Sequence, residues 1–130
     1  MSVVGCVFLF MILCYISDSV AADPEIVKIG LNYPESGPYE KQGLDQRRAA
    51  EMAVEEINAS GGILGKKVQL ILRDTKSNAK KARANAAELY TDYGVPMILG
   101  GSSSAVAIAS GEEALLKNRL FFANANIEMK

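Results

Sequence analysis

The sequence has no histidine and no tryptophan, and its only cysteines are Cys6 and Cys14. Without histidine, the chain cannot form a Ser-His-Asp triad, and it has no imidazole to bind a metal ion. If the first residues are removed after synthesis, the mature chain also has no cysteine. That would exclude a disulfide, a thiol nucleophile and a cysteine-based metal site.

A strong charge of one sign is missing as well. The formal net charge is -1 over 130 residues, and the apolar fraction of 49% and charged fraction of 22% are ordinary for a globular protein. A nucleic-acid partner would require a basic face, so we expect none. The length predicts about one domain.

The first 22 residues have the pattern of a secretory signal peptide. Val3–Ile16 is almost wholly apolar, residues 17–19 are polar, and Val20–Ala22 provides small residues before a cleavage point. The apolar run of about 14 residues is shorter than the roughly 20 that a helix needs to cross a bilayer, which makes a membrane anchor the weaker alternative. We therefore expect a cleaved signal at 1–22 and a mature domain at 23–130, located in the periplasm or outside the cell.

Apolar periodicity in the mature part predicts strands that alternate with helices. The order is typical of an α/β fold, a Rossmann-like parallel sheet with helices on both faces. In such sheets, ligands bind beyond the carboxyl ends of the strands. The predicted strands are 25–33, 68–73, 95–99 and 120–123, the predicted helices are 43–60, 79–93 and 104–117, and the buried stripe of the first helix is Ala50, Ala53, Val54 and Ile57.

The stretch Ile98–Ala107 carries the most informative motif. It reads as a buried strand, the glycine pair 100–101, and three hydroxyls at Ser102, Ser103 and Ser104 where a helix begins. A helix start has unpaired backbone N–H groups and the positive end of the helix dipole, so the motif suits a carboxylate or phosphate. Plain N-capping, for which one serine suffices, is the alternative.

Three loops are predicted to meet at the carboxyl border of the sheet: 34–42, 100–104 and 124–127. Besides the three serines, these loops offer Ser36 and Tyr39, and then Asn124 and Asn126. The loop at 74–78 also follows a strand, and we expect it to lie further from the centre.

Two phosphate-binding motifs are excluded. The segment Gly61–Lys66 superficially resembles a phosphate loop, but it has one residue too few between its glycines, Lys67 replaces the required Ser or Thr, and it runs from helix to strand. No G-x-G-x-x-G follows the first strand. The remaining hydroxyls, amides and N–H groups indicate binding without chemistry, so we expect no enzyme activity and no cofactor.

Several segments, taken in order, resemble the type I periplasmic solute-binding proteins. They are Ile26–Gly30, Ser36–Tyr39 and Ala53–Gly65. The resemblance covers about Ile26–Asn126 and is strongest to the branched-chain amino-acid and amide-binding (Leu/Ile/Val-binding) components of ABC importers. It implies a truncated chain that holds part of the first of two lobes, a small polar ligand such as an amino acid or amide, and ABC permease subunits as partners.

The resemblance also implies which residues contact the ligand. A serine at the start of the third helix would hold the ligand's carboxylate and ammonium, and it corresponds to Ser104, with Ser103 beside it. The loop after the first strand, Ser36–Tyr39, would contribute to the cleft.

The segment after the fourth strand would supply a backbone carbonyl at Ala125 and a hydroxyl near Ile127. Because Ile127 has no hydroxyl, either Asn124 or Asn126 would take over this role, or the ligand is an amide or another polar solute. A ligand-sensing domain of a receptor or regulator, an inactive remnant and an enzyme on the same sheet remain as alternative interpretations.

Overall fold

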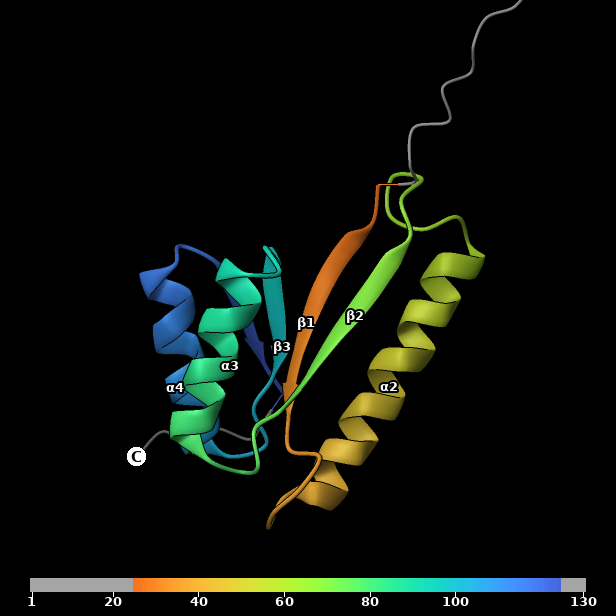
Figure 1. Ribbon diagram of the computed structural model, residues 1–130. Helices are drawn as coiled ribbons and strands as arrows, with labels where there is room; N and C mark the ends of the chain where they lie inside the picture. The colour runs from red at the N-terminus through yellow and green to blue at the C-terminus, as the bar shows by residue number, and fades with distance from the viewer. Residues whose placement is uncertain (1–24, 125–130) are drawn as a thin grey trace, which may run out of the picture.

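A computed structural model describes residues 25–124, so the predicted signal at 1–22, with both cysteines, lies outside the described residues. Strands and helices alternate along this part of the chain, as predicted (Figure 1). None of its helices is long and apolar enough to cross a membrane. In order, the elements are β1 (Val27–Tyr33), α2 (Glu40–Ala59), β2 (Val68–Asp74), α3 (Ala79–Thr91), β3 (Met97–Gly100), α4 (Ser104–Leu116) and β4 (Leu120–Ala123).

The four strands form one parallel sheet in the order β2-β1-β3-β4. Helix α2 covers one face, and helices α3 and α4 cover the other (Figure 1). The predicted fold class, a parallel α/β sheet with helices on both faces, is therefore confirmed. The chain extends the sheet on one side of β1 with β2 and on the other side with β3, so the direction of winding reverses between β1 and β3. Such a switch point is where open α/β sheets bind ligands.

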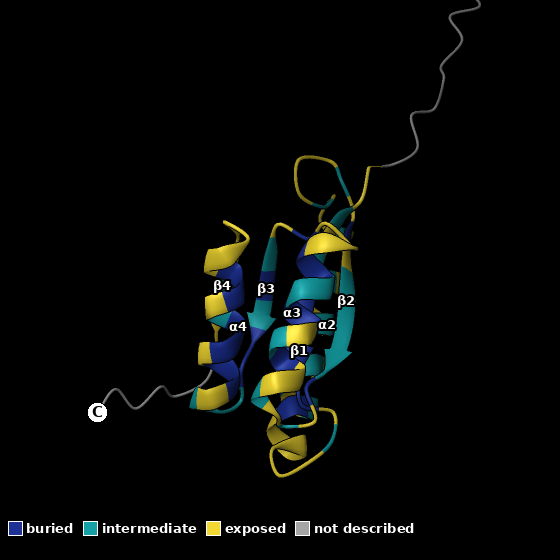
Figure 2. Ribbon diagram, turned by 60° about the vertical axis from the view of Figure 1, so that its left-hand side comes forward, coloured by how far each residue is buried: buried dark blue, intermediate teal, exposed yellow. Residues whose placement is uncertain are grey.

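The two faces of the sheet are covered to different extents (Figure 2). Helix α2 lies over β1 and β2, and Gly43 is its only buried residue. The predicted stripe of α2 was partly wrong: Ala53 is exposed, whereas Ala50 and Val54 are half-buried. No helix among residues 25–124 covers the α2 side of β4, where Leu120 is 60% exposed. Helical spacing marks a face that can be buried, but α2 packs on β1 and β2, and within residues 25–124 nothing covers Ala53.

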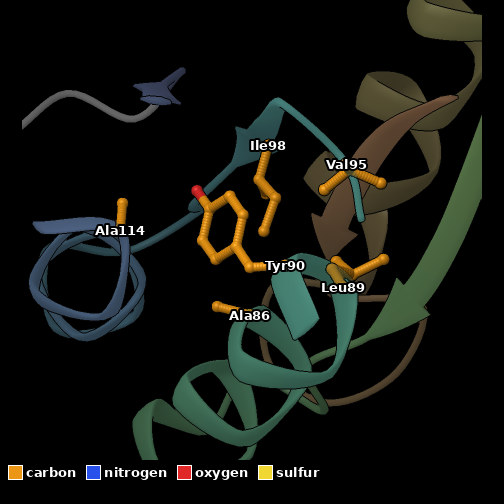
Figure 3. Close-up of a cluster of buried hydrophobic side chains, with 6 residues drawn as sticks. All are labelled: Ala86, Leu89, Tyr90, Val95, Ile98 and Ala114. Atoms are coloured by element: carbon orange, nitrogen blue, oxygen red, sulfur yellow. The ribbon is translucent and has the colours of Figure 1, made fainter. Parts of the chain in front are cut away.

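The core lies on the other face, under α3 and α4. Figure 3 shows the ring of Tyr90, which extends from α3 with Ile98 of β3 and Ala114 of α4 on either side. The Tyr90 hydroxyl donates a hydrogen bond to the Leu120 carbonyl at 2.8 Å, and burial raises the pKa of Tyr90 to about 12. The buried cluster consists of Ala86, Leu89, Tyr90, Val95, Ile98 and Ala114.

The observed boundaries differ from the predicted ones where local hydrogen bonds decide them. Helix α2 begins at Glu40, three residues before the predicted start, so Gln42 lies in the helix and not in the preceding loop. Strand β3 begins at Met97, because the Val95 N–H still donates to the Leu89 carbonyl of α3 at 3.2 Å. Asn78 caps α3, as one of the two predicted candidates, by accepting from the Lys81 N–H at 2.9 Å.

Candidate functional site

A buried amide network fixes the carboxyl end of β1. The Asn32 side-chain amide donates to the Ala82 carbonyl at 2.8 Å and to the Ser110 hydroxyl at 3.2 Å. The Asn85 amide donates to the Asn32 side-chain oxygen at 3.0 Å and to the Asp74 carbonyl at 2.9 Å. These bonds connect β1 to α3, to α4 and to the end of β2, so they hold the border of the sheet in place.

The loop after β1 is bonded to the loop after β2. The Ser36 hydroxyl donates to Asp74 Oδ2 at 2.8 Å, and the Ser77 hydroxyl donates to the Ser36 carbonyl at 3.1 Å. The Tyr39 N–H donates to the Ser77 hydroxyl at 3.2 Å. The loop at 74–78, which we expected to lie further from the centre, therefore holds both Ser36 and Tyr39. They lie at the predicted border, but on its β2 side.

Asp74 is the anchor of this loop pair. Burial by itself would raise the pKa of Asp74, but the Lys76 N–H, the Ser36 hydroxyl and the Glu35 N–H all donate to its carboxylate and lower the pKa below its ordinary value. The carboxylate is thus charged at neutral pH, and its oxygens accept hydrogen bonds from the loops after β1 and β2. It therefore holds the two loops at the border of the sheet. Within residues 25–124, no second carboxyl group is hydrogen-bonded to it as an acid–base partner.

The three serines of the glycine turn have three different environments. The Ser102 hydroxyl donates to Gln46 Oε1 of α2 at 3.2 Å. Ser103 is the N-cap of α4, and its hydroxyl accepts from the Val106 N–H at 3.4 Å, so the capping alternative holds for this residue. Ser104 is the first residue of α4 and is half-buried. Within residues 25–124, no hydrogen bond occupies its hydroxyl.

A hollow of about 690 Å³ lies beside this turn, between α2 and the ends of β1 and β3. Of the predicted site residues, Ser102 and Asn124 line it, whereas Ser36, Tyr39, Ser103 and Ser104 do not. Ala125 and Asn126, as well as Ile127, lie outside the described residues. The hollow is lined by Leu31, Gln42, Asp45, Gln46, Ala49, Ala50, Leu99, Ser102 and Asn124.

Sequence reasoning missed the contribution of α2. Gln42 and Gln46 are four residues apart, so they lie on one side of the helix and give the hollow two amide side chains. The predicted loop 34–42 contains Gln42, and no predicted site residue lies between 43 and 60. The signal that could have found this wall is the run of amides and alanines at helical spacing.

No Lys or Arg side chain lines the hollow, so an anion there would have to be bound by uncharged donors. Asp45, the one charged residue in its lining, lies 3.4 Å from Arg48 in an exposed pair. Arg47 forms ion pairs with Glu35 at 3.2 Å and with Glu51 at 2.8 Å. Among residues 25–124, no group of three His, Cys, Asp or Glu side chains could hold a metal ion. Backbone N–H groups and hydroxyls at the start of α4 are then the groups suited to a negative ligand atom.

Comparison with known sequences gives a family match and clear relatives. Residues 26–128 match the family model described as periplasmic binding protein. Leu/Ile/Val-binding protein homolog 7 of Brucella melitensis is 38% identical over 96 residues, which are 74% of this chain and 24% of the relative. Leu/Ile/Val-binding protein homolog 8 of Brucella abortus is 40% identical over 96 residues, which again are 74% of this chain and 24% of the relative. The chain thus spans about a quarter of the length of these relatives.

Solved structures agree with this result. The branched-chain amino acid transporter substrate-binding protein LivJ of Streptococcus pneumoniae, in complex with isoleucine, has a TM-score of 0.77 and 30% identity, and the match covers 80% of this chain and 30% of LivJ. A periplasmic binding protein type 1 from Bordetella pertussis has a TM-score of 0.69 and 33% identity, with 75% and 26% covered. Sequence and fold together lead to one conclusion: the chain belongs to the periplasmic binding protein family.

Proposed function

We propose that this chain forms part of the first lobe of a solute-binding protein of an ABC importer, and that it contributes one wall of a site for an amino acid, an amide or a similar small polar solute. The relatives named Leu/Ile/Val-binding proteins and the LivJ structure with isoleucine support this proposal. The observation that carries it is the hollow at the switch between β1 and β3, which Ser102 of the serine turn and Asn124 both line. The proposed activity is binding, without a chemical step.

The groups in the wall and those next to it in the chain have proposed roles. The Ser104 hydroxyl and the N–H groups at the start of α4 bind the carboxylate of the solute, while Ser103 caps the helix. Ser102 acts with Gln46, to which it is bonded, in presenting a polar wall. Asn124, which also lines the hollow, provides an amide.

Four further predicted residues are also proposed to belong to the site, although they do not line the hollow. Ser36 and Tyr39 lie on the β2 side of the same border, where they would meet a second lobe that closes over the site. Ala125 and Asn126 follow Asn124 directly in the sequence. As a solute-binding component, the protein would be secreted by its leader, would act in the periplasm or outside the cell, and would deliver its solute to ABC permease subunits.

The role of Ser104 can be tested in a hybrid that contains the whole site. Residues 26–124 replace the corresponding part of S. pneumoniae LivJ, and isoleucine binding is measured by isothermal titration calorimetry. We expect Ser104→Ala to weaken binding by about 1–3 kcal/mol, the cost of losing a hydrogen bond to a charged group. Ser103→Ala is the matched control, because loss of a cap lowers stability by about 1 kcal/mol and leaves the ligand contact intact. Equal affinities of the Ser104→Ala and unmodified hybrids would refute the role of Ser104.

The chain on its own is expected to bind isoleucine too weakly to be stabilised by it. It spans about a quarter of its relatives, so it offers one wall of the site, and a ligand raises the melting temperature only when its concentration exceeds its Kd for the folded state. Thermal unfolding with and without millimolar isoleucine measures this. A clear upward shift would show that the described wall suffices for binding.

A further inference from the structure

Strand β2 forms one edge of the described sheet (Figure 1). In a parallel pair, alternate residues direct their backbone groups towards the neighbouring strand. The Val27 N–H donates to the Lys67 carbonyl at 2.8 Å, and the Thr75 N–H donates to the Tyr33 carbonyl at 2.9 Å, so the odd-numbered residues of this segment bond to β1. The even-numbered residues direct their N–H and C=O groups to the open side: Val68, Leu70, Leu72 and Asp74.

The side chain of Asn58, near the end of α2, occupies both backbone groups of Val68. Its oxygen accepts a hydrogen bond from the Val68 N–H at 2.8 Å, and its amide donates to the Val68 carbonyl at 2.9 Å. A neighbouring strand would bond to the same two groups. Asn58 therefore takes the place of a further strand at the start of β2.

Arg73 protects the other half of the edge. Its Nη1 donates to the Leu72 carbonyl at 2.8 Å, while its Nε and Nη2 donate to Glu88 Oε1 of α3 at 3.1 and 2.6 Å. Its Cζ also lies 4.7 Å from the centre of the Tyr93 ring, a cation–π contact. The hydrogen bond with Glu88 raises the pKa of Arg73 above its ordinary value, so a fixed positive charge stands beside the Leu72 carbonyl.

The two side chains leave an opening that is too short for a strand. Between Val68 and Leu72, Leu70 is the one residue that directs backbone groups outward, and within residues 25–124 no side-chain hydrogen bond occupies them. A strand that paired with β2 would have to displace Asn58 or Arg73 before it could bond fully to more than this residue. Displacing Asn58 would separate α2 from the start of β2, and displacing Arg73 would break its ion pair with Glu88.

We propose that Asn58 and Arg73 guard the β2 edge, so that it does not pair with a strand of another molecule. An edge strand with free N–H and C=O groups is a template for association, and natural sheets block it with charges or covering groups. Here an amide from α2 blocks one end and a guanidinium blocks the other. The guard uses contacts among α2, β2 and α3 alone, so it holds or fails independently of the proposed function.

Sedimentation equilibrium of the full chain, over a hundredfold range of concentration, tests the guard. Asn58→Ala frees both backbone groups of Val68, and we expect it to strengthen self-association at least tenfold relative to the unmodified chain. Strand β4, the other edge of the described sheet, is the same in both chains, so the difference reports on β2. Asn78→Ala is the matched control, because it also removes an asparagine that accepts a backbone N–H, but at the start of α3. It should associate like the unmodified chain.

A second substitution shows whether the association uses β2. Gln69 is exposed on this strand, and Gln69→Lys places a positive charge on the edge that Asn58→Ala has freed. We expect the double variant, Asn58→Ala with Gln69→Lys, to return to the association of the unmodified chain.

Arg73→Met tests the guard independently, because it leaves the bonds between Asn58 and Val68 intact. It should also strengthen self-association at least tenfold, whereas its control, Arg83→Met, breaks an arginine–glutamate pair between α3 and α4 and should have no such effect. Circular dichroism shows which variants are folded. The proposal is overturned if neither Asn58→Ala nor Arg73→Met associates more strongly than its control, or if Gln69→Lys leaves the association of Asn58→Ala unchanged.

Discussion

Replacing Gly43 with alanine is expected to destabilise the fold by about 3 kcal/mol, at the upper end of what overpacking usually costs. Alanine is normally the better residue inside a helix, by about 1 kcal/mol. Here, however, a Cβ at position 43 would overlap the carbonyl oxygen of Pro34 and lie 2.6 Å from its carbonyl carbon. Both atoms belong to the backbone, so no side-chain rotation relieves the overlap. Either α2 or the loop after β1 has to move.

Urea denaturation of the Gly43→Ala chain measures this effect, and the molecule offers a matched control. Gly111 is also a helical glycine, but a Cβ there would meet only the Phe121 ring, at an ordinary 3.6 Å. Gly111→Ala is therefore expected to stabilise the chain by up to about 1 kcal/mol. If both substitutions shifted the midpoint in the same direction, the close approach of α2 to Pro34 would not be the cause.

The position of Gly43 also bears on the candidate site. Because Gly43 lets α2 approach the end of β1, it sets the distance between the sheet and the amides of Gln42 and Gln46 one turn or less away. These amides line the hollow together with Ser102, to which Gln46 is hydrogen-bonded. A glycine required for packing thus also determines the width of the hollow.

The order of elements and the sheet could be predicted from the sequence because each depends on local patterns. The apolar run of β1 and the cap at Asn78 are features of a few neighbouring residues. The exposure of Ala53 could not be predicted in this way, since its helical spacing is correct and the missing cover belongs to another part of the fold. Periodicity identifies a face that can be buried, and only the three-dimensional arrangement shows whether it is.

In the candidate site, too, the local features could be predicted from the sequence and the long-range pairings could not. The serine turn at 102–104 could be recognised because a strand, a glycine pair and a helix start follow one another in the chain. The hydrogen bond from Ser36 to Asp74 spans 38 residues, and the one from Ser102 to Gln46 spans 56. Neither pairing leaves a mark in the local sequence. The order of the strands was enough to place the loops on one border. It did not show that hydrogen bonds to Asp74 and Ser77 hold Ser36 and Tyr39 on the β2 side, outside the lining of the hollow.

The buried network around Asn32 depends on the longest separations and carries the second large prediction. Its amide bonds to Ala82, Asn85 and Ser110, at separations of 50, 53 and 78 residues. Asn32 is fully buried. We expect Asn32→Ala to lower the free energy of unfolding by about 4 kcal/mol, because it leaves several buried polar groups without partners, at about 1–3 kcal/mol each, and opens a cavity.

The comparison that isolates the network is a double-mutant cycle with Asn85→Ala, measured by urea denaturation. If the two amides act as one unit, Asn85→Ala should cost at least about 1 kcal/mol less when Asn32 is already alanine, since contacting residues couple by about 0.5–3 kcal/mol. Asn78→Ala serves as the control, because it removes an exposed cap and should cost about 1 kcal/mol regardless of residue 32. If the costs at positions 32 and 85 simply added, the two amides would be stabilising the fold separately. The end of β1 would then be held by its strand neighbours, and the border that carries the site would not depend on this network.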